Sequence, residues 1–110
     1  MADLRPLLVV LALIGCATVD PTPPPSPYTL VPASTGLDVA GSGGREIGFG
    51  RDRDGALASA SGVTGAPPQP VPCAGGRDGV RVDASLTMIF TGETFTGWQT
   101  EDAAAGTPCA

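Results

Sequence analysis

A dense run of prolines near the N-terminal end constrains the fold of this chain most. Six prolines fall between positions 21 and 32, and a glycine- and serine-rich run from Ala40 to Gly44 follows them. Consecutive prolines favour extended polyproline II, and this stretch has few large apolar side chains with which to offset the entropy of ordering. We therefore expect a disordered Pro/Gly/Ser-rich linker over residues 16–44, which leaves residues 45–100 for a small domain.

One alternative keeps part of this stretch in the domain. Four larger side chains would then dock onto it as a short strand: Tyr28, Leu30, Val31 and Leu37. Chain ends are usually loose unless they are packed against a domain, so the linker is the main expectation.

The domain is expected to begin with a short extended segment over Glu46–Gly50. Ile47 and Phe49 lie two residues apart in it, so both side chains point to one face of a strand. Preceding glycines give the stretch Gly41–Gly48 some likeness to a phosphate-binding loop. Glu46 stands where the dinucleotide fingerprint needs glycine, and the chain has no lysine for a Walker motif, so we expect no nucleotide cofactor.

A single short helix is expected from about Arg53 to Ser61. Asp52 or Asp54 offers an N-cap, because a short carboxylate side chain can accept the first free backbone N–H groups. Apolar residues follow at helical spacing: Ala56, Leu57, Ala60 and Val63. Glycines and prolines then end the helix: Gly62, Gly65, Pro67 and Pro68. The acidic residues superficially resemble a calcium loop, but further ligand positions are missing, so capping is the expectation and no metal is expected.

Three strands are expected after a proline- and glycine-rich loop over Gln69–Gly79. They contain, in turn, Val80 and Val82, the alternating residues from Ser85 to Thr91, and the aromatic residues of Glu93–Gln99. A hairpin turn at Gly92 and a turn near Ala84 would join them as an antiparallel meander. The predicted fold class is therefore α+β, with one short helix packed on a three-stranded antiparallel meander.

Two details of this fold depend on single residues. Phe95 and Trp98 fall on opposite faces of the last strand unless Gly97 introduces a bulge. Glu101 and Asp102 belong to an irregular tail over residues 101–110. We expect these two carboxylates to be solvated and not to work as an acid–base pair.

The N-terminal end contains a short apolar run that is separate from the predicted domain. The apolar run from Leu7 to Ile14 would be about 12 Å long as a helix, against about 30 Å of membrane hydrocarbon, so it cannot span. Leu13-Ile14-Gly15-Cys16 closes that run and resembles the lipobox of bacterial lipoproteins. The resemblance implies that cleavage between Gly15 and Cys16 removes residues 1–15 as a signal peptide, and that Cys16 is acylated and held in membrane lipid. The alternative is an ordinary signal peptide with an incidental cysteine.

This resemblance also implies a location in the cell envelope. Ala17 stands where enterobacterial lipoproteins kept in the inner membrane have aspartate, which favours the outer membrane, facing the periplasm. The linker would hold the domain on the order of 50 Å or more from the lipid headgroups.

Cys73 and Cys109 are the cysteines left once Cys16 carries lipid. The Gram-negative periplasm is oxidising and a domain of this size has a small core, so we expect a disulfide between them. Two free thiols are the alternative.

Composition excludes several functional classes. The net charge is -5, no lysine is present, and the six basic residues are all arginine, which argues against a nucleic-acid partner. The chain has no histidine, so Ser-His-Asp triads, Cys-His pairs and most zinc sites are excluded. We therefore expect a protein that is not an enzyme.

A longer pattern extends from Gly44 to Trp98, with Glu46–Arg51 and Phe95–Trp98 as its motifs. It resembles a group of small Gram-negative lipoproteins that brings no established activity with it. In shape, the order of a helix, a proline-containing turn and an antiparallel sheet is more remotely similar to the small lipoprotein subunit of the outer-membrane β-barrel assembly machine and to β-lactamase-inhibitor-like modules.

Two functional hypotheses follow. The first is a membrane-anchored, non-enzymatic interaction or structural module that binds another envelope protein. The second is a small ligand-binding or inhibitor domain, or a minor envelope enzyme, that acts on an anionic ligand. The candidate interaction surface in either case consists of Arg45, Arg51, Arg53 and Trp98, although core packing is the more common role for a strand-end tryptophan.

Overall fold

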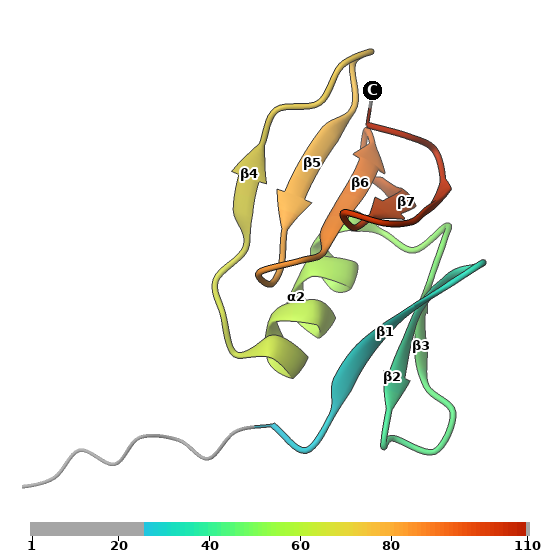
Figure 1. Cartoon of the computed structure of the whole chain (residues 1–110), viewed down its shortest axis with the longest axis vertical. Helices are drawn as coiled ribbons and strands as arrows, with labels where there is room; N and C mark the ends of the chain where they lie inside the picture. Colours follow the sequence, from blue (N-terminus) through green and yellow to red (C-terminus); the bar gives the residue numbers. More distant parts are fainter. Residues whose placement is uncertain (1–25, 110) are drawn as a thin grey trace, which may run out of the picture.

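The computed structural model describes residues 26–109, so the predicted signal peptide, Gly15 and Cys16 lie outside the described residues. Over this range the chain forms one helix and eight strands (Figure 1). In chain order they are β1 (Thr29–Ala33), β2 (Gly36–Ala40), β3 (Glu46–Gly48), α2 (Arg53–Thr64), β4 (Gln69–Val71), β5 (Asp78–Arg81), β6 (Thr87–Thr91), β7 (Thr94–Gln99) and β8 (Ala104–Gly106).

The strands form two antiparallel sheets. The smaller has the order β1-β2-β3 and the larger has the order β4-β5-β6-β7-β8. The helix lies between the two sheets in Figure 1 and contacts strands of both. The predicted fold class, one short helix on a three-stranded meander, is therefore wrong, because the described part is mostly β. The predicted meander is present as β5-β6-β7, the centre of the larger sheet.

The hairpin β1–β2 occupies residues that we expected to be linker. Leu30 and Leu37 are 8% and 0% exposed, so two large side chains of this stretch reach the core. In an antiparallel pair, backbone N–H groups point alternately toward the partner strand and away from it. The Pro32 nitrogen points away from β2, to the outer edge of β1, so its missing N–H costs no hydrogen bond between the strands. The disordered-linker prediction is thus wrong for residues 29–40, which form two paired strands where the docking alternative expected one short strand.

One hydrophobic core joins both sheets and the helix. It includes Leu37 and Ile47 of the smaller sheet, Ala60 of α2, and Phe90 and Phe95 of the larger sheet, each at most 1% exposed. Because the two sheets share this core, residues 26–109 form a single packed unit.

The segment before the helix ties the smaller sheet to β7. The Gly50 N–H donates to the Phe95 carbonyl at 2.8 Å, and the Phe95 N–H donates to the Arg51 carbonyl at 2.9 Å. The rings of Phe49 and Phe95 meet edge to face, with centroids 5.1 Å apart. The backbone at Arg51 is therefore held in place by β7.

The helix begins as predicted and ends later. Asp52 is the N-cap and accepts the Gly55 N–H at 2.8 Å, which confirms the capping prediction. Gly65 ends the helix with φ 74° and donates its N–H to the Ser61 carbonyl. The helix continues three residues past the predicted end because Gly62 takes a helical conformation there, at a cost of about 1 kcal/mol relative to alanine.

A bulge in β7 places both of its aromatic side chains on one face. The register against β6 shifts between Ile89 and Phe90, which leaves Thr96 as the extra residue, one position before the glycine expected to cause it. Phe95 and Trp98 consequently both point into the core, at 0% and 5% exposure.

The C-terminal residues are more ordered than predicted. Ala104–Gly106 forms β8 against β7, so the expectation of an irregular tail is wrong for these residues. The sulfur atoms of Cys73 and Cys109 lie at disulfide-bonding distance, with Cα atoms 4.9 Å apart, as the sequence predicts. None of the helical structure described in residues 26–109 is long and apolar enough to cross a membrane.

Candidate functional site

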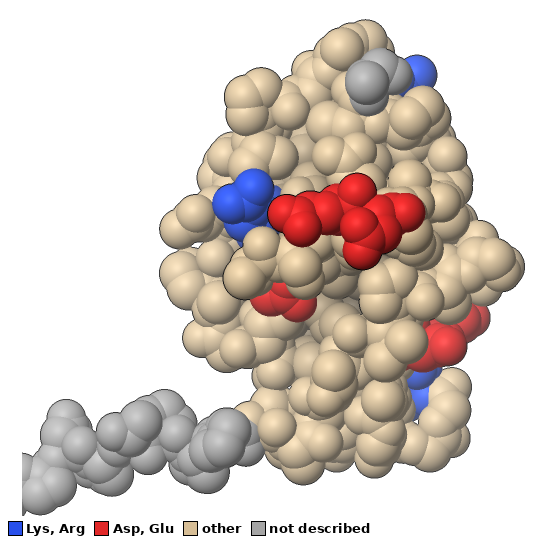
Figure 2. Space-filling view, in the orientation of Figure 1, with Lys and Arg blue, Asp and Glu red and all other residues tan. Residues whose placement is uncertain are grey.

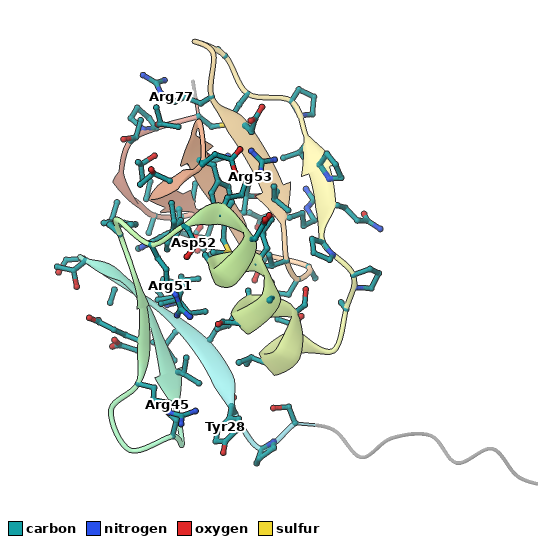
Figure 3. The ribbon with its side chains drawn as sticks, turned by 180° about the vertical axis from the view of Figure 1, so that it is seen from behind. Tyr28, Arg45, Arg51, Asp52, Arg53 and Arg77 are labelled. Carbon is teal, nitrogen blue, oxygen red and sulfur yellow. A yellow bond between two sulfur atoms is a disulfide. The ribbon has the colours of Figure 1, made fainter. Side chains whose placement is uncertain are left out.

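A hollow lies between the smaller sheet and α2, with a volume of about 440 Å³. We call it the sheet–helix groove. Its walls include Tyr28, Val39, Arg45, Ile47, Arg51 and Val63. Figure 3 shows Tyr28 and Arg45 near each other at one end of the smaller sheet, with Arg51 farther along, toward the larger sheet.

Strand register sets the sheet wall of the groove. Val39 pairs with Leu30 on β1, and its N–H donates to the Arg45 carbonyl at 2.9 Å. Cross-strand partners share one face, and so do residues two apart on a strand, which adds Tyr28 and Ile47 to this face. Three separate strand segments therefore present their groove residues toward the helix.

The loop between β2 and β3 positions Arg45. The Ser42 hydroxyl donates to the Val39 carbonyl at 2.5 Å and accepts the Arg45 N–H at 3.1 Å. Gly43 and Gly44 have φ values of 81° and 103°, a region that residues with a side chain rarely adopt. The glycine-rich run is thus a tight connection between two strands.

Ser59, Gly62 and Val63 form the helix wall, at the spacing that puts side chains on one helix face. A Cβ atom built at Gly62 would meet no other atom within 4 Å, so the groove is open above this residue. Val39 and Val63 are partly buried and pack against the core, which makes the base of the groove apolar.

The groove contains two arginines in a chain that is acidic overall. Among residues 26–109, neither Arg45 nor Arg51 has a carboxylate oxygen within 4 Å, and Glu46 is the acidic residue in the wall. On the face drawn in Figure 2, by contrast, acidic side chains gather over the middle and most of the remaining surface is uncharged. The two groove arginines are therefore available to an anionic group.

A second hollow, of about 800 Å³, adjoins the first. The two share Tyr28, Gly62 and Val63, and the second extends past the C-terminal end of α2 to Asp83. Together they form one continuous depression beside the last turns of the helix.

The other two residues of the predicted interaction surface lie outside the groove. Arg53 pairs with Asp78 at 2.8 Å, and its guanidinium stands 5.1 Å from the centre of the Phe90 ring. Trp98 is buried and donates its indole N–H to the Ala33 carbonyl at 2.7 Å. Arg45 and Arg51 therefore both line the groove, at separate positions along it (Figure 3), whereas Arg53 and Trp98 have structural contacts.

The remaining predicted sites have separate positions. Cys73 and Cys109 join the loop after β4 to the C-terminal tail, where the Ala74 N–H also donates to the Cys109 carbonyl at 2.8 Å. Within the described part of the chain, no three His, Cys, Asp or Glu side chains are grouped as metal ligands would be.

Tyr28, Val39, Ile47 and Val63 are groove residues that sequence reasoning did not assign to a site. Tyr28 stands two residues before Leu30, so strand alternation could have placed both on one face. Nothing in the local pattern shows that Tyr28 faces the helix, because that contact depends on how the smaller sheet packs.

Comparisons with protein-family models, with curated protein sequences and with solved structures found no significant match to this chain.

Proposed function

We propose that this chain is a membrane-anchored envelope lipoprotein that works as a non-enzymatic interaction module, attached to lipid through acylated Cys16. Its proposed partner is another envelope protein. One observation carries the proposal: Ser26, Pro27 and Tyr28, which directly follow the segment leading from Cys16, line the joined hollows. The proposed binding surface and the proposed anchor are therefore at the same end of the domain.

The attachment would be short. Nine residues separate Cys16 from Ser26, and an extended residue spans at most about 3.5 Å, so the domain would stand within about 35 Å of the lipid. This is closer than the distance expected for a linker that continues to residue 44. A module at this distance could bind partners at the membrane surface, in the outer membrane facing the periplasm.

Available side chains support a role in binding. The chain has no histidine, and the two described cysteines lie at bonding distance from each other, so nucleophile–base pairs built on these residues are not available. A second candidate function, a small anionic ligand, is favoured by the placement of Arg45 and Arg51 in one groove.

Membrane fractionation tests the anchor. We expect the wild-type chain in the detergent-requiring fraction and the Cys16→Ser variant in the soluble periplasmic fraction, because acyl chains supply the membrane affinity. Intact-mass analysis of the extracted protein should show the acyl groups on wild type alone. Equal retention of both chains in the membrane would contradict the anchor.

Site-specific photo-crosslinking tests the partner. A photoreactive residue in place of Tyr28 should give an adduct with an envelope protein, whereas the same residue in place of exposed Glu93, at the β6–β7 turn, should not. Adducts of equal yield at both positions, or at neither, would contradict partner binding through this surface.

A further inference from the structure

We propose that the sheet–helix groove binds a single-chain amphipathic anion, with its head group on Arg51 and its aliphatic chain between the smaller sheet and α2, toward Tyr28 (Figure 3). This proposal rests on the second candidate function and deepens it by naming the class of anion. Binding of the ligand does not depend on the anchor, so the two proposals can fail separately.

The base of the groove suits an aliphatic chain. Val39 of the sheet and Val63 of the helix are half-buried and line the groove together with Ile47, which is 1% exposed, and Tyr28, 40% exposed, lies at the end of the sheet wall. An aliphatic chain placed here would cover apolar surface that water now contacts, which favours binding. Gly62 leaves the space for it, because no atom lies within 4 Å of where its Cβ would be.

Arg51 forms the head-group end, whereas Arg45 lies farther along the groove, beside Tyr28 (Figure 3). A guanidinium donates two parallel N–H bonds to a carboxylate or a phosphate, and neither arginine has a carboxylate partner among the described residues. The Arg51 backbone is held at both ends, since its N–H donates to Gly48 at 3.3 Å and its carbonyl accepts from Phe95 at 2.9 Å. The backbone from which the Arg51 side chain extends is therefore fixed before an anion binds.

The size and charge of the depression favour one head group and one chain. A volume of about 440 Å³ lies within the range of small-ligand sites, roughly 300–1,000 Å³. The adjoining hollow gives room for the end of the chain, and Asp83 there would repel a second anion.

Four ten-carbon probes test the site on the purified Cys16→Ser chain, each below its micellar concentration: decanoate, decyl phosphate, decyltrimethylammonium and decyl maltoside. We expect decanoate or decyl phosphate to shift the backbone amide resonances of Val39, Ile47 and Val63 saturably. The neutral and cationic probes should bind at least about tenfold more weakly, because they lack the charge-assisted contacts. Comparing the two anions distinguishes a carboxylate source, such as a fatty acid, from a phosphate source.

Matched variants test the contacts. Arg51→Gln should weaken binding of the better anion about tenfold, whereas Arg81→Gln removes the same charge outside the groove and should leave binding unchanged. Gly62→Ala should weaken binding by narrowing the groove while raising the thermal midpoint, because alanine is the better helix residue. Weaker binding together with a higher thermal midpoint would show that the added methyl group occupies the site and does not damage the fold.

Three results would overturn the site. The first is decyl maltoside binding as tightly as both anions, which would indicate a plain apolar patch. The second is anion binding that Arg51→Gln leaves unchanged. The third is the absence of saturable shifts with all four probes, including the case in which the chain binds anionic phospholipid vesicles alone.

Discussion

The indole N–H of Trp98 donates a 2.7 Å hydrogen bond to the carbonyl of Ala33, which lies 65 residues earlier in the chain. Trp98 belongs to β7 of the larger sheet, and Ala33 is the last residue of β1 in the smaller sheet. This bond ties the end of the N-terminal hairpin to the centre of the domain. A tryptophan at the end of a strand thus fixes how the two sheets sit together.

Trp98→Phe should lower the free energy of unfolding by about 1–3 kcal/mol, because it leaves the Ala33 carbonyl without its donor and removes buried ring area. Urea unfolding followed by far-UV circular dichroism measures the change, since Trp98 is the single tryptophan and its fluorescence is lost. Val31→Thr, at an exposed site on β1, is the control and should stay within about 0.5 kcal/mol of wild type. Equal stability of Trp98→Phe and wild type would contradict the role of this bond.

Asp52→Ala should destabilise the domain by about 1 kcal/mol, because the Gly55 N–H at the start of α2 loses its acceptor. Asp52→Asn keeps a side-chain oxygen and should be close to wild type. Thermal and urea unfolding of the two variants give the comparison. The cap would lose its assigned role if asparagine and alanine were equally destabilising.

Reduction of the Cys73–Cys109 pair should lower stability by about 3–4 kcal/mol in the chain-entropy model, since the crosslink closes a loop over a sequence separation of 36. Urea midpoints with and without reductant measure the change. The Cys73→Ser, Cys109→Ser double variant should have the midpoint of the reduced protein, and reductant should not alter it. Two titratable thiols in the untreated mature protein would show that no disulfide forms.

Gly97→Ala should destabilise by about 1–3 kcal/mol, because a Cβ there would collide with the backbone oxygen and nitrogen of Thr107 beside β8. Gly62→Ala makes the same chemical change in open space on the helix and should be stabilising by up to about 1 kcal/mol. The denaturation midpoints of the two variants, measured in one series, give the comparison. A neutral Gly97→Ala would mean that β8 does not pack this closely on β7.

Local patterns in the sequence predicted the elements whose signals lie within a few residues. Asp52 before a helical apolar pattern identified the start of α2, and alternation around Met88 identified β6. The hairpin β1–β2 was missed because six prolines outweighed two leucines in the average composition, and the tolerance of Pro32 depends on its edge position.

Of the four residues predicted to form the interaction surface, two line the groove and two do not, for a similar reason. Its members were chosen by residue type, as arginine or aromatic side chains. Strand pairing and packing decide which of them face the same groove. Asp78 and Phe90 engage Arg53, whereas Arg45 and Arg51 border the groove.

By itself the sequence determined the capped helix, the three central strands and the pairing of Cys73 with Cys109, because capping, alternation and cysteine number are local or countable properties. Only the tertiary structure decided that Tyr28, Arg45 and Val63 line one groove. Their contact arises from the register of the smaller sheet and its packing on α2 through a shared core. Both are set by non-local burial of apolar side chains, which a single sequence does not display.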